Sequence, residues 1–260
     1  MKIILFSDIH YSLDRDVYGR SSKVCLRRAI THANRYHGDA DLCIILGDLT
    51  DRGLESEYQS LSADLEILSS PYRMLLGNHD NRDQYIGVFG TDLLDKNGFV
   101  QSVVDAGSHR FLLLDTHTPG QGWGSLDGNR LEWLDKALIL ADRPCFVCLH
   151  HPPLSTALPA YDAIGLLGAE RFAAVLNRHR STVLQVLFGH CHMSVSGSLG
   201  GVPVCGIQSL LYQALPNFAD NRFLDAPNLS PAYGLAVVNG RNVMIHRIEF
   251  GYSDEVVASD

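Results

Sequence analysis

Continuous apolar runs and segments with helical periodicity alternate between residues 2 and 188 of the chain. Short apolar runs are typical of strands buried on both faces of a sheet, and here they predict strands at 2–7, 42–46, 72–76, 100–104, 111–114, 146–149 and 183–188. Between them, apolar residues at helical spacing predict helices at 22–36, 54–68, 128–140 and 169–178. This alternation indicates an α/β fold.

A different pattern begins near residue 194, where short alternating segments are separated by turns. These segments predict strands at 194–199, 202–207, 233–238 and 243–249, as an antiparallel continuation of the sheet. The segment 208–231 is rich in proline and aromatic residues and shows no clear period. We expect this segment to form a cap or a dimerisation segment.

Helices that alternate with strands before an antiparallel portion are expected to pack outside stacked mixed sheets. The chain shows no internal repeat and no low-complexity linker, so residues 1–260 are expected to form a single domain. In open α/β folds, ligands bind beyond the carboxyl ends of the strands. The residues that directly follow each predicted strand are therefore the first candidates for a functional site.

Potential metal ligands follow five of the predicted strands. The motifs are Asp8-Ile9-His10, Gly47-Asp48, Gly77-Asn78-His79-Asp80, His150-His151 and Gly189-His190-Cys191-His192. Each motif alone has a simpler explanation as a turn or a strand end. Together at one sheet edge, they would crowd charge there at a cost of several kcal/mol unless it is paired or metal-bound. The set therefore favours a metal centre, and carboxylate with imidazole ligands suits Mn, Fe, Zn or Co.

The five motifs, in this order and with no substitution at a ligand position, resemble the signature of the calcineurin-like metallophosphoesterases. The short layout of the chain is similar to the bacterial class III cyclic-nucleotide phosphodiesterase and glycerophosphodiesterase group. The motifs span residues 8–192, and the resemblance beyond residue 192 is only general. It implies a four-layer α/β/β/α sandwich and two divalent or mixed-valence transition metal ions bridged by one carboxylate.

The resemblance also assigns ligands to the two metals. It places the first metal on Asp8, His10, Asp48 and His192. It places the second metal on Asp48, Asn78, His150 and His190, so that Asp48 bridges the pair. A metal-bridging hydroxide would then attack a small phosphodiester of the cyclic-nucleotide or glycerophosphodiester type. This mechanism agrees with the absence of a convincing serine or cysteine nucleophile.

Two further residues of the third motif have expected roles. The resemblance implies that His79 lies over the phosphate, where it stabilises negative charge or protonates the leaving oxygen. With the bridging Asp48, it makes up the expected catalytic pair. Asp80 either orients the His79 ring or takes part in a turn or a salt bridge.

Substrate contacts are expected from a small set of residues around the motifs. Asn78 and His79 are the first candidates, because they are expected beside the phosphate. Tyr11 directly follows His10 and is a further candidate. His151 either contacts the substrate or only flanks His150. The identity of the substrate is expected to depend on residues 81–99 and 208–231.

Charge and composition exclude several other classes of function. The formal net charge is −8 and no basic stripe is present, which excludes polymeric nucleic acid as a partner. No apolar stretch approaches the roughly 20 residues that span a membrane, and the run at 3–6 is too short for a signal peptide. The six cysteines lie in apolar contexts, typical of reduced and buried thiols. We therefore expect a cytoplasmic protein without a membrane partner.

Two alternative functions stay open alongside the phosphodiesterase. One is a phosphomonoesterase of the same fold, because this kind of metal centre hydrolyses both types of ester. The other is a non-catalytic scaffold that binds metal, although a scaffold would not need His79 or a complete bridging site. The apolar, proline-rich segment 208–231 also predicts a homo-oligomer.

Overall fold

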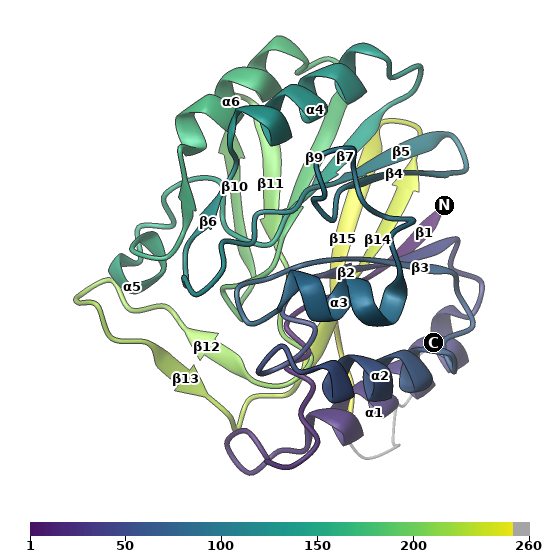
Figure 1. Cartoon of the computed structure of the whole chain (residues 1–260), viewed down its shortest axis with the longest axis vertical. Helices are drawn as coiled ribbons and strands as arrows, with labels where there is room; N and C mark the ends of the chain where they lie inside the picture. Colours follow the sequence, from purple (N-terminus) through teal and green to yellow (C-terminus); the bar gives the residue numbers. More distant parts are fainter. Residues whose placement is uncertain (252–260) are drawn as a thin grey trace, which may run out of the picture.

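A computed structural model describes residues 1–251 of the chain, and two mixed sheets form its centre (Figure 1). The first sheet has the strand order β15 (Asn242–Glu249), β14 (Ala232–Asn239), β1 (Lys2–Phe6), β2 (Leu42–Leu46) and β3 (Tyr72–Leu75). The second has the order β10 (Val195–Leu199), β11 (Val202–Gly206), β9 (Val183–Phe188), β7 (Cys145–Cys148), β5 (His109–Leu113) and β4 (Ser102–Ala106).

Three apolar clusters show how the layers are stacked. The middle cluster joins the two sheets, with residues such as Leu5 and Ile44 from the first sheet and Phe146 and Leu187 from the second. One outer cluster packs α1 (Ser22–His37), α2 (Glu55–Leu65) and α3 (Arg82–Phe89) against the first sheet. The other packs α4 (Gly128–Ile139) and α6 (Ala169–Arg178) against the second sheet. The expected α/β/β/α sandwich is confirmed.

Local sequence explains the boundaries of the helices. At α1, the side chain of Ser21 accepts a hydrogen bond from the amide of Val24, which caps the first turn. The helix α3 was not predicted, because only Tyr85 of its eight residues is buried and it therefore has no apolar stripe. It forms because the Asn81 side chain caps it by accepting from the amides of Asp83 and Gln84.

The direction of one strand differs from the prediction. The strands after residue 194 were expected to continue the sheet in antiparallel fashion, and β10, β14 and β15 do so. However, β11 inserts between β10 and β9 and runs parallel to β9, with Val204 opposite Val186. An alternating sequence pattern marks which face of a strand is buried but not the direction of its neighbour.

The segment 208–231 contains a small two-stranded sheet of β12 (Gln213–Leu215) and β13 (Leu224–Ala226). In Figure 1 this hairpin lies to one side of the two large sheets, next to α5 (Pro159–Asp162). Another two-stranded sheet joins β6 (Gly124–Ser125) and β8 (Leu166–Leu167). The hairpin is held at the ends of the strands, because the amide of Leu210 donates to the carbonyl of Ser7 and that of Ala214 to His192.

Two expectations from composition can be compared with the structure. All six cysteines are free, and Cys145, Cys148 and Cys191 are buried in apolar clusters, so they contribute to packing. Within residues 1–251, no helix is both long and apolar enough to cross a membrane.

Candidate metal centre

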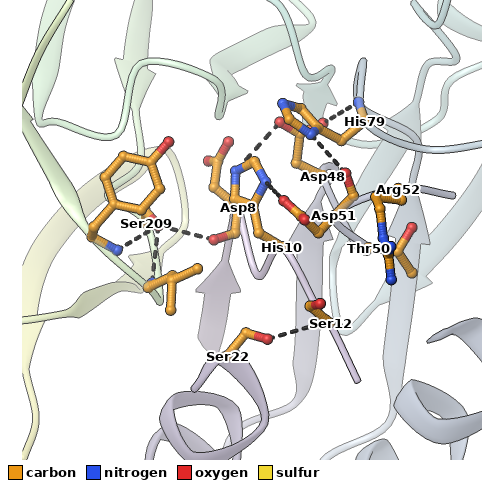
Figure 2. Close-up of polar contacts among 12 residues, drawn as sticks. Asp8, His10, Ser12, Ser22, Asp48, Thr50, Asp51, Arg52, His79 and Ser209 are labelled. Atoms are coloured by element: carbon orange, nitrogen blue, oxygen red, sulfur yellow. Dashed lines mark hydrogen bonds and ion pairs between the residues drawn. The ribbon is translucent and has the colours of Figure 1, made fainter. Parts of the chain in front are cut away.

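The loops that follow β1, β2, β3, β7 and β9 bring the seven predicted ligands to one edge of the paired sheets. Figure 2 shows Asp8 and His10 above the end of β1, with Asp48 and His79 beside them. The backbone of the first two loops is joined directly, because the amide of Asp8 donates to Gly47 and the amide of His10 donates to Asp48. The parallel pairing of β1 with β2 therefore places their exit residues side by side.

Five of the seven predicted ligands have a backbone conformation that non-glycine residues rarely adopt. The φ angles are positive at Asp8 (51°), His10 (45°), Asp48 (48°), His190 (69°) and His192 (51°). Such a conformation costs of order 1–3 kcal/mol per residue and persists only where the surroundings enforce it. Strain of this kind, repeated around one point, is typical of a functional site.

The first expected ligand set converges at the ends of β1 and β9. The Nε2 atom of His192 lies 3.3 Å from Oδ1 of Asp8 and 3.1 Å from Nε2 of His10. The Nε2 atom of His10 in turn lies 3.6 Å from Oδ2 of Asp48. These four side chains are buried, and their ligand atoms all lie within 4.8 Å of one another.

The second expected ligand set converges beside the first. The Oδ1 atom of Asn78 lies 3.1 Å from Nε2 of His150 and 2.9 Å from Nδ1 of His190. The two ring nitrogens are 3.2 Å apart. The Nε2 atom of His150 also lies 3.4 Å from Oδ2 of Asp48. The same carboxylate oxygen of Asp48 therefore borders both sets.

Hydrogen bonds at the Nδ1 atoms of two histidine rings show that the Nε2 atoms of these rings can bind a cation. The Nδ1 atom of His150 donates to the carbonyl of Leu46, and Nδ1 of His192 donates to the carbonyl of Tyr212. In the neutral rings, both Nε2 atoms then carry lone pairs, and these lone pairs are aimed at carboxylate or amide oxygens. Acceptors facing acceptors repel unless a cation lies between them, so the residues present fit a metal ion at each set.

The charges in the cluster also favour a cation. Burial lowers the pKa of His10 and of His190 to about 3, so both rings are neutral at pH 7. Burial acts in the same direction on His150, but the carboxylate of Asp48 outweighs it and raises the pKa of His150 to about 9. Although burial opposes it, the charges of His150 and His79 hold the pKa of Asp48 well below its usual range. A bound metal ion can take the place of the proton on His150.

His79 belongs to the cluster without lying among the two ligand sets. Its amide donates to Oδ1 of Asp48, and its ring Nδ1 donates to the backbone carbonyl of Asp51 at 3.0 Å. Its ring lies 4.5 Å from the ring of His10, edge to face. The Asp48 carboxylate raises the pKa of His79, which favours its protonated form. His79 is thus oriented as a donor beside the cluster, as Figure 2 shows.

Asp80 takes the turn role, one of the two roles expected for it. Its buried carboxylate accepts hydrogen bonds from the amides of Leu49, Thr50 and Gly77 and from the hydroxyls of Thr50 and Tyr58. Burial and the charge of Asp48 raise the pKa of Asp80 to about 6. Asp80 therefore ties the loop after β2 to the loop after β3, while Asp51 orients the His79 ring.

Two candidate substrate contacts, Tyr11 and His151, do not lie on the wall of the cavity. The Tyr11 side chain is fully buried in the core, where its hydroxyl donates to Asp64, so the expectation that it touches the substrate is wrong. His151 is also fully buried, and its Nδ1 atom lies 2.7 Å from the hydroxyl of Thr116. Its ring packs 4.9 Å from that of His190, behind the cavity rather than on its wall. His151 therefore supports a ligand rather than contacting the substrate.

Two glycines allow the loops to approach one another. A Cβ atom on Gly77 would overlap the backbone and the carboxylate of Asp48. A Cβ atom on Gly189 would lie 2.9 Å from the carbonyl of Leu46 and 3.0 Å from Oδ2 of Asp8. These contacts explain why a glycine precedes both ligand motifs.

A cavity of about 230 Å³ opens onto both ligand sets. Its wall includes His79 and five residues that were not singled out in the sequence, namely Tyr161, Ile164, Tyr212, Phe223 and Asp225. Three of the five come from the segment 208–231, on which the identity of the substrate was expected to depend, and the aromatic content of this segment is the signal for Tyr212 and Phe223. No residue of 81–99 lies on this wall.

The comparisons with known proteins agree with this geometry. The model of the calcineurin-like phosphoesterase family matches residues 1–194, and the chain belongs to this family. It is 30% identical over 257 residues to a probable cyclic nucleotide phosphodiesterase of Rhodopseudomonas palustris, covering 97% of this chain and 93% of the relative. It is 32% identical over 170 residues to a probable glycerophosphodiester phosphodiesterase of Arcobacter nitrofigilis, covering 64% of this chain and 62% of the relative.

A solved structure supports the fold. The purple acid phosphatase PPD1 from yellow lupin superimposes with a TM-score of 0.67 and 15% identity, covering 95% of this chain and 51% of that one. The fold, the family and the class of enzyme expected from the motifs, a metal-dependent phosphoesterase, are therefore confirmed. The centre is one for divalent metal ions.

Proposed function

We propose that the chain hydrolyses small phosphodiesters at a centre of two metal ions. The observation that carries this proposal is the position of Asp48, whose Oδ2 atom lies 3.6 Å from Nε2 of His10 in one ligand set and 3.4 Å from Nε2 of His150 in the other. One carboxylate between two ligand sets is the arrangement that serves two adjacent cations. We further propose Mn, Fe, Zn or Co as the metals, because the ligands are carboxylate, amide and imidazole without thiolate.

The protein would hold the first ion with Asp8, His10, Asp48 and His192, and the second with Asp48, Asn78, His150 and His190. When bound, a pair of such ions polarises the phosphoryl oxygens and lowers the pKa of water. The buried side chains around the ions orient the ring nitrogens and keep most of the water out.

His79 supplies the proton chemistry of the chain itself. Its Nδ1 atom is occupied by the Asp51 carbonyl, so Nε2 is left for the cavity whose wall His79 helps to form. Because the Asp48 charge favours the protonated ring, Nε2 carries a hydrogen for donation. It can donate to a phosphoryl oxygen as charge develops and then protonate the leaving oxygen. Asn78, which also lies on the wall, is positioned to contact the same phosphate.

The cavity favours a diester over a monoester. Its wall contains no lysine or arginine and includes the carboxylate of Asp225. A phosphomonoester brings close to two negative charges at pH 7, whereas a diester brings one, so this wall penalises the monoester more. The two relatives described above are named for cyclic nucleotides and for glycerophosphodiesters, and both classes are candidate substrates here.

The test compares the metal-loaded protein with its Asp48→Ala variant. Protein loaded with Mn²⁺ is assayed with bis-p-nitrophenyl phosphate, p-nitrophenyl phosphate and cyclic AMP. We expect turnover of the diesters by the wild type and none by the variant. Equal rates for the two proteins, or no turnover with Mn, Fe, Zn or Co, would reject the proposal. A strong preference for p-nitrophenyl phosphate would favour the phosphomonoesterase instead.

The cytoplasmic location and the homo-oligomer stay predictions. We propose that the segment 208–231 mediates the oligomer, because Leu215, Phe218 and Phe223 are large apolar residues with 48%, 68% and 47% exposure. Size-exclusion chromatography with light scattering tests this, and a monomeric mass would contradict it.

A further inference from the structure

The loop that follows β5 contributes no side chain to either ligand set, although it lies at the same edge of the sheets. β5 runs parallel to β7, so its exit lies beside that of the strand that carries His150. The loop consists of Asp115, Thr116 and His117, and all three are buried. Burying a carboxylate, a hydroxyl and an imidazole is unfavourable unless each finds a polar partner. The partners of these three side chains therefore indicate what the loop does.

The ring of His117 is bonded to the peptide group that carries a predicted metal ligand. Its Nδ1 atom donates to the backbone carbonyl of Gly77 at 3.0 Å. This carbonyl belongs to the planar peptide unit that joins Gly77 to Asn78, so the bond fixes the plane from which the backbone of Asn78 starts. Burial lowers the pKa of His117, so its ring is neutral at pH 7 and its one ring hydrogen is used in this bond.

A salt bridge ties the far end of the same motif to the loop. Arg82 is the first residue of α3, and its Nε and Nη2 atoms donate to the two carboxylate oxygens of Asp115 at 2.7 and 2.9 Å. Its Nη2 atom also donates to the carbonyl of His117, whose amide donates to Asp115. Such charge-assisted, two-pronged bonds are strong and directional. The loop therefore holds the chain on both sides of Asn78.

The hydroxyl of Thr116 reaches the second ligand set by another route. Its Oγ1 atom lies 2.7 Å from Nδ1 of His151, and the ring of His151 packs 4.9 Å from that of His190. His190 and Asn78 both belong to the second set. The contacts of the loop therefore lead to two ligands of the same ion.

Asn78 is the ligand of this set whose orientation matters most. Its Oδ1 atom lies 3.1 Å from Nε2 of His150 and 2.9 Å from Nδ1 of His190. Because the amide is neutral, it attracts a cation only through the dipole of its carbonyl, and only when Oδ1 points at the ion. A group that fixes the backbone of Asn78 should therefore strengthen the binding of that ion.

We propose that His117 is a positioning residue for Asn78, and that it acts through its hydrogen bond to the carbonyl of Gly77. The salt bridge between Arg82 and Asp115 keeps His117 within reach of this carbonyl. This inference rests on the proposed centre of two metal ions and concerns the ion that Asn78 would bind.

The test measures the binding of Mn²⁺ rather than activity. Titration calorimetry of the full-length, metal-free protein should resolve two sites in the wild type. We expect His117→Ala to lower the affinity of one site about 10- to 100-fold and to leave the other unchanged. His117→Asn should keep most of the affinity, because the asparagine amide can donate from the position of Nδ1. His117→Gln places its amide at the position of Nε2 instead, so it should lose affinity as the alanine variant does.

A double-mutant cycle separates positioning from general damage to the protein. If His117 acts through Asn78, His117→Ala should not lower the affinity further in an Asn78→Ala background. In an Asp8→Asn background, which keeps Asn78, the same substitution should still lower the affinity of the remaining site 10- to 100-fold. A full additional loss in the Asn78→Ala background would overturn the inference.

His109 provides a matched control at the other end of β5. It is also buried, and its Nε2 atom donates to the backbone carbonyl of Gly240 at 2.7 Å. His109→Ala removes the same kind of bond and should lower the melting temperature, but both Mn²⁺ affinities should stay at the wild-type values.

The outcomes distinguish this inference from the proposed function. Two wild-type affinities in His117→Ala would overturn the inference and leave the centre of two metal ions intact. Equal affinities in the asparagine and glutamine variants would also overturn it, and this comparison stands even if the alanine variant does not fold. If the wild type does not bind two Mn²⁺ ions, the proposed centre itself fails.

Discussion

The imidazole ring of His151 lies 4.9 Å from that of His190, and the Nε2 atom of each ring is buried without a hydrogen-bond partner among residues 1–251. The Nδ1 atom of His190 faces Asn78, where a metal ligand is expected, so its Nε2 atom carries the hydrogen. No hydrogen bond joins the two Nε2 atoms, but the ring nitrogens of His150, His151 and His190 lie within 4.8 Å of one another, so the buried ring of His151 supports the ring of His190 from behind.

Replacing His151 should therefore weaken one metal site without removing a ligand. We expect His151→Ala to lower the affinity for one of the two ions about 10- to 100-fold, because His190 loses the group that fixes its orientation. Titration calorimetry with Mn²⁺ measures this directly. The exposed His246 offers a matched control, since His246→Ala should leave both affinities unchanged. Wild-type affinity in His151→Ala would show that its ring only fills space.

The shared position of Asp48 predicts an effect on metal content that no other ligand gives. Asp48→Asn should lower the occupancy of both sites, because its Oδ2 atom borders both ligand sets. Asp8→Asn should affect only the site that includes His192. Metal analysis by inductively coupled plasma mass spectrometry gives the number of ions per chain. Equal losses in the two variants would contradict a bridging role for Asp48.

His79 should affect the rate rather than the metal. We expect His79→Gln to lower kcat about 100- to 1,000-fold, because glutamine can donate a hydrogen bond but cannot transfer a proton to the leaving oxygen. The metal content should stay at the wild-type value, because His79 lies outside the two proposed ligand sets and its Nδ1 atom is already bonded to the Asp51 carbonyl. The effect should also shrink for diesters with a good leaving group such as p-nitrophenol. A loss of metal in His79→Gln would instead make His79 a ligand.

The glycines before the ligand motifs make a prediction about geometry. Gly77→Ala and Gly189→Ala should each reduce metal binding, because the added methyl group would displace the carboxylate of Asp48 or of Asp8. Gly87→Ala is the matched control in α3, where a Cβ atom meets nothing within 4 Å. There the substitution should stabilise the protein slightly, since alanine favours the helix. Metal affinity and the melting temperature, measured together, separate the two outcomes.

The buried carboxylate of Asp64 links stability to pH. Although burial opposes it, hydrogen bonds from Arg27 and Tyr11 lower the pKa of Asp64 in the folded protein. Because the folded pKa lies below the unfolded one, the stabilisation is complete above the unfolded pKa and disappears as the pH falls through the folded pKa.

Asp64→Asn should consequently lower the free energy of unfolding by about 1–2 kcal/mol at pH 7. The difference from the wild type should shrink as the pH falls below about 4. Urea unfolding of the metal-free proteins at several pH values measures it. The exposed Asp14 is a suitable control, since Asp14→Asn should change stability much less. A difference that is independent of pH would show that packing, not charge, accounts for the effect of Asp64.

Much of the fold could be predicted from the sequence, because the patterns that mark strands and helices are local. Apolar runs and, after residue 194, alternating segments located every strand of the two large sheets to within about two residues, and helical spacing located α1, α2, α4 and α6. The position of the ligand motifs at one site could be predicted for a related reason. Each one follows a buried strand, and parallel strands carry their exit residues to the same edge. The helix α3, with one buried residue, lacked such a signal.

The remaining features depend on contacts between residues far apart in the sequence. Nothing next to Tyr11 shows that its side chain turns to Asp64 instead of the substrate, because that choice is made by the packing of α2 on β1. The cavity wall likewise joins Tyr161 of α5 to Phe223 and Asp225 of the segment 208–231. The sequence by itself thus determined the layers of the fold, the strand ends that carry the ligand motifs and the metal chemistry that these ligands allow. Only the tertiary structure decided which side chains surround the substrate, because loops place those residues together through long-range packing.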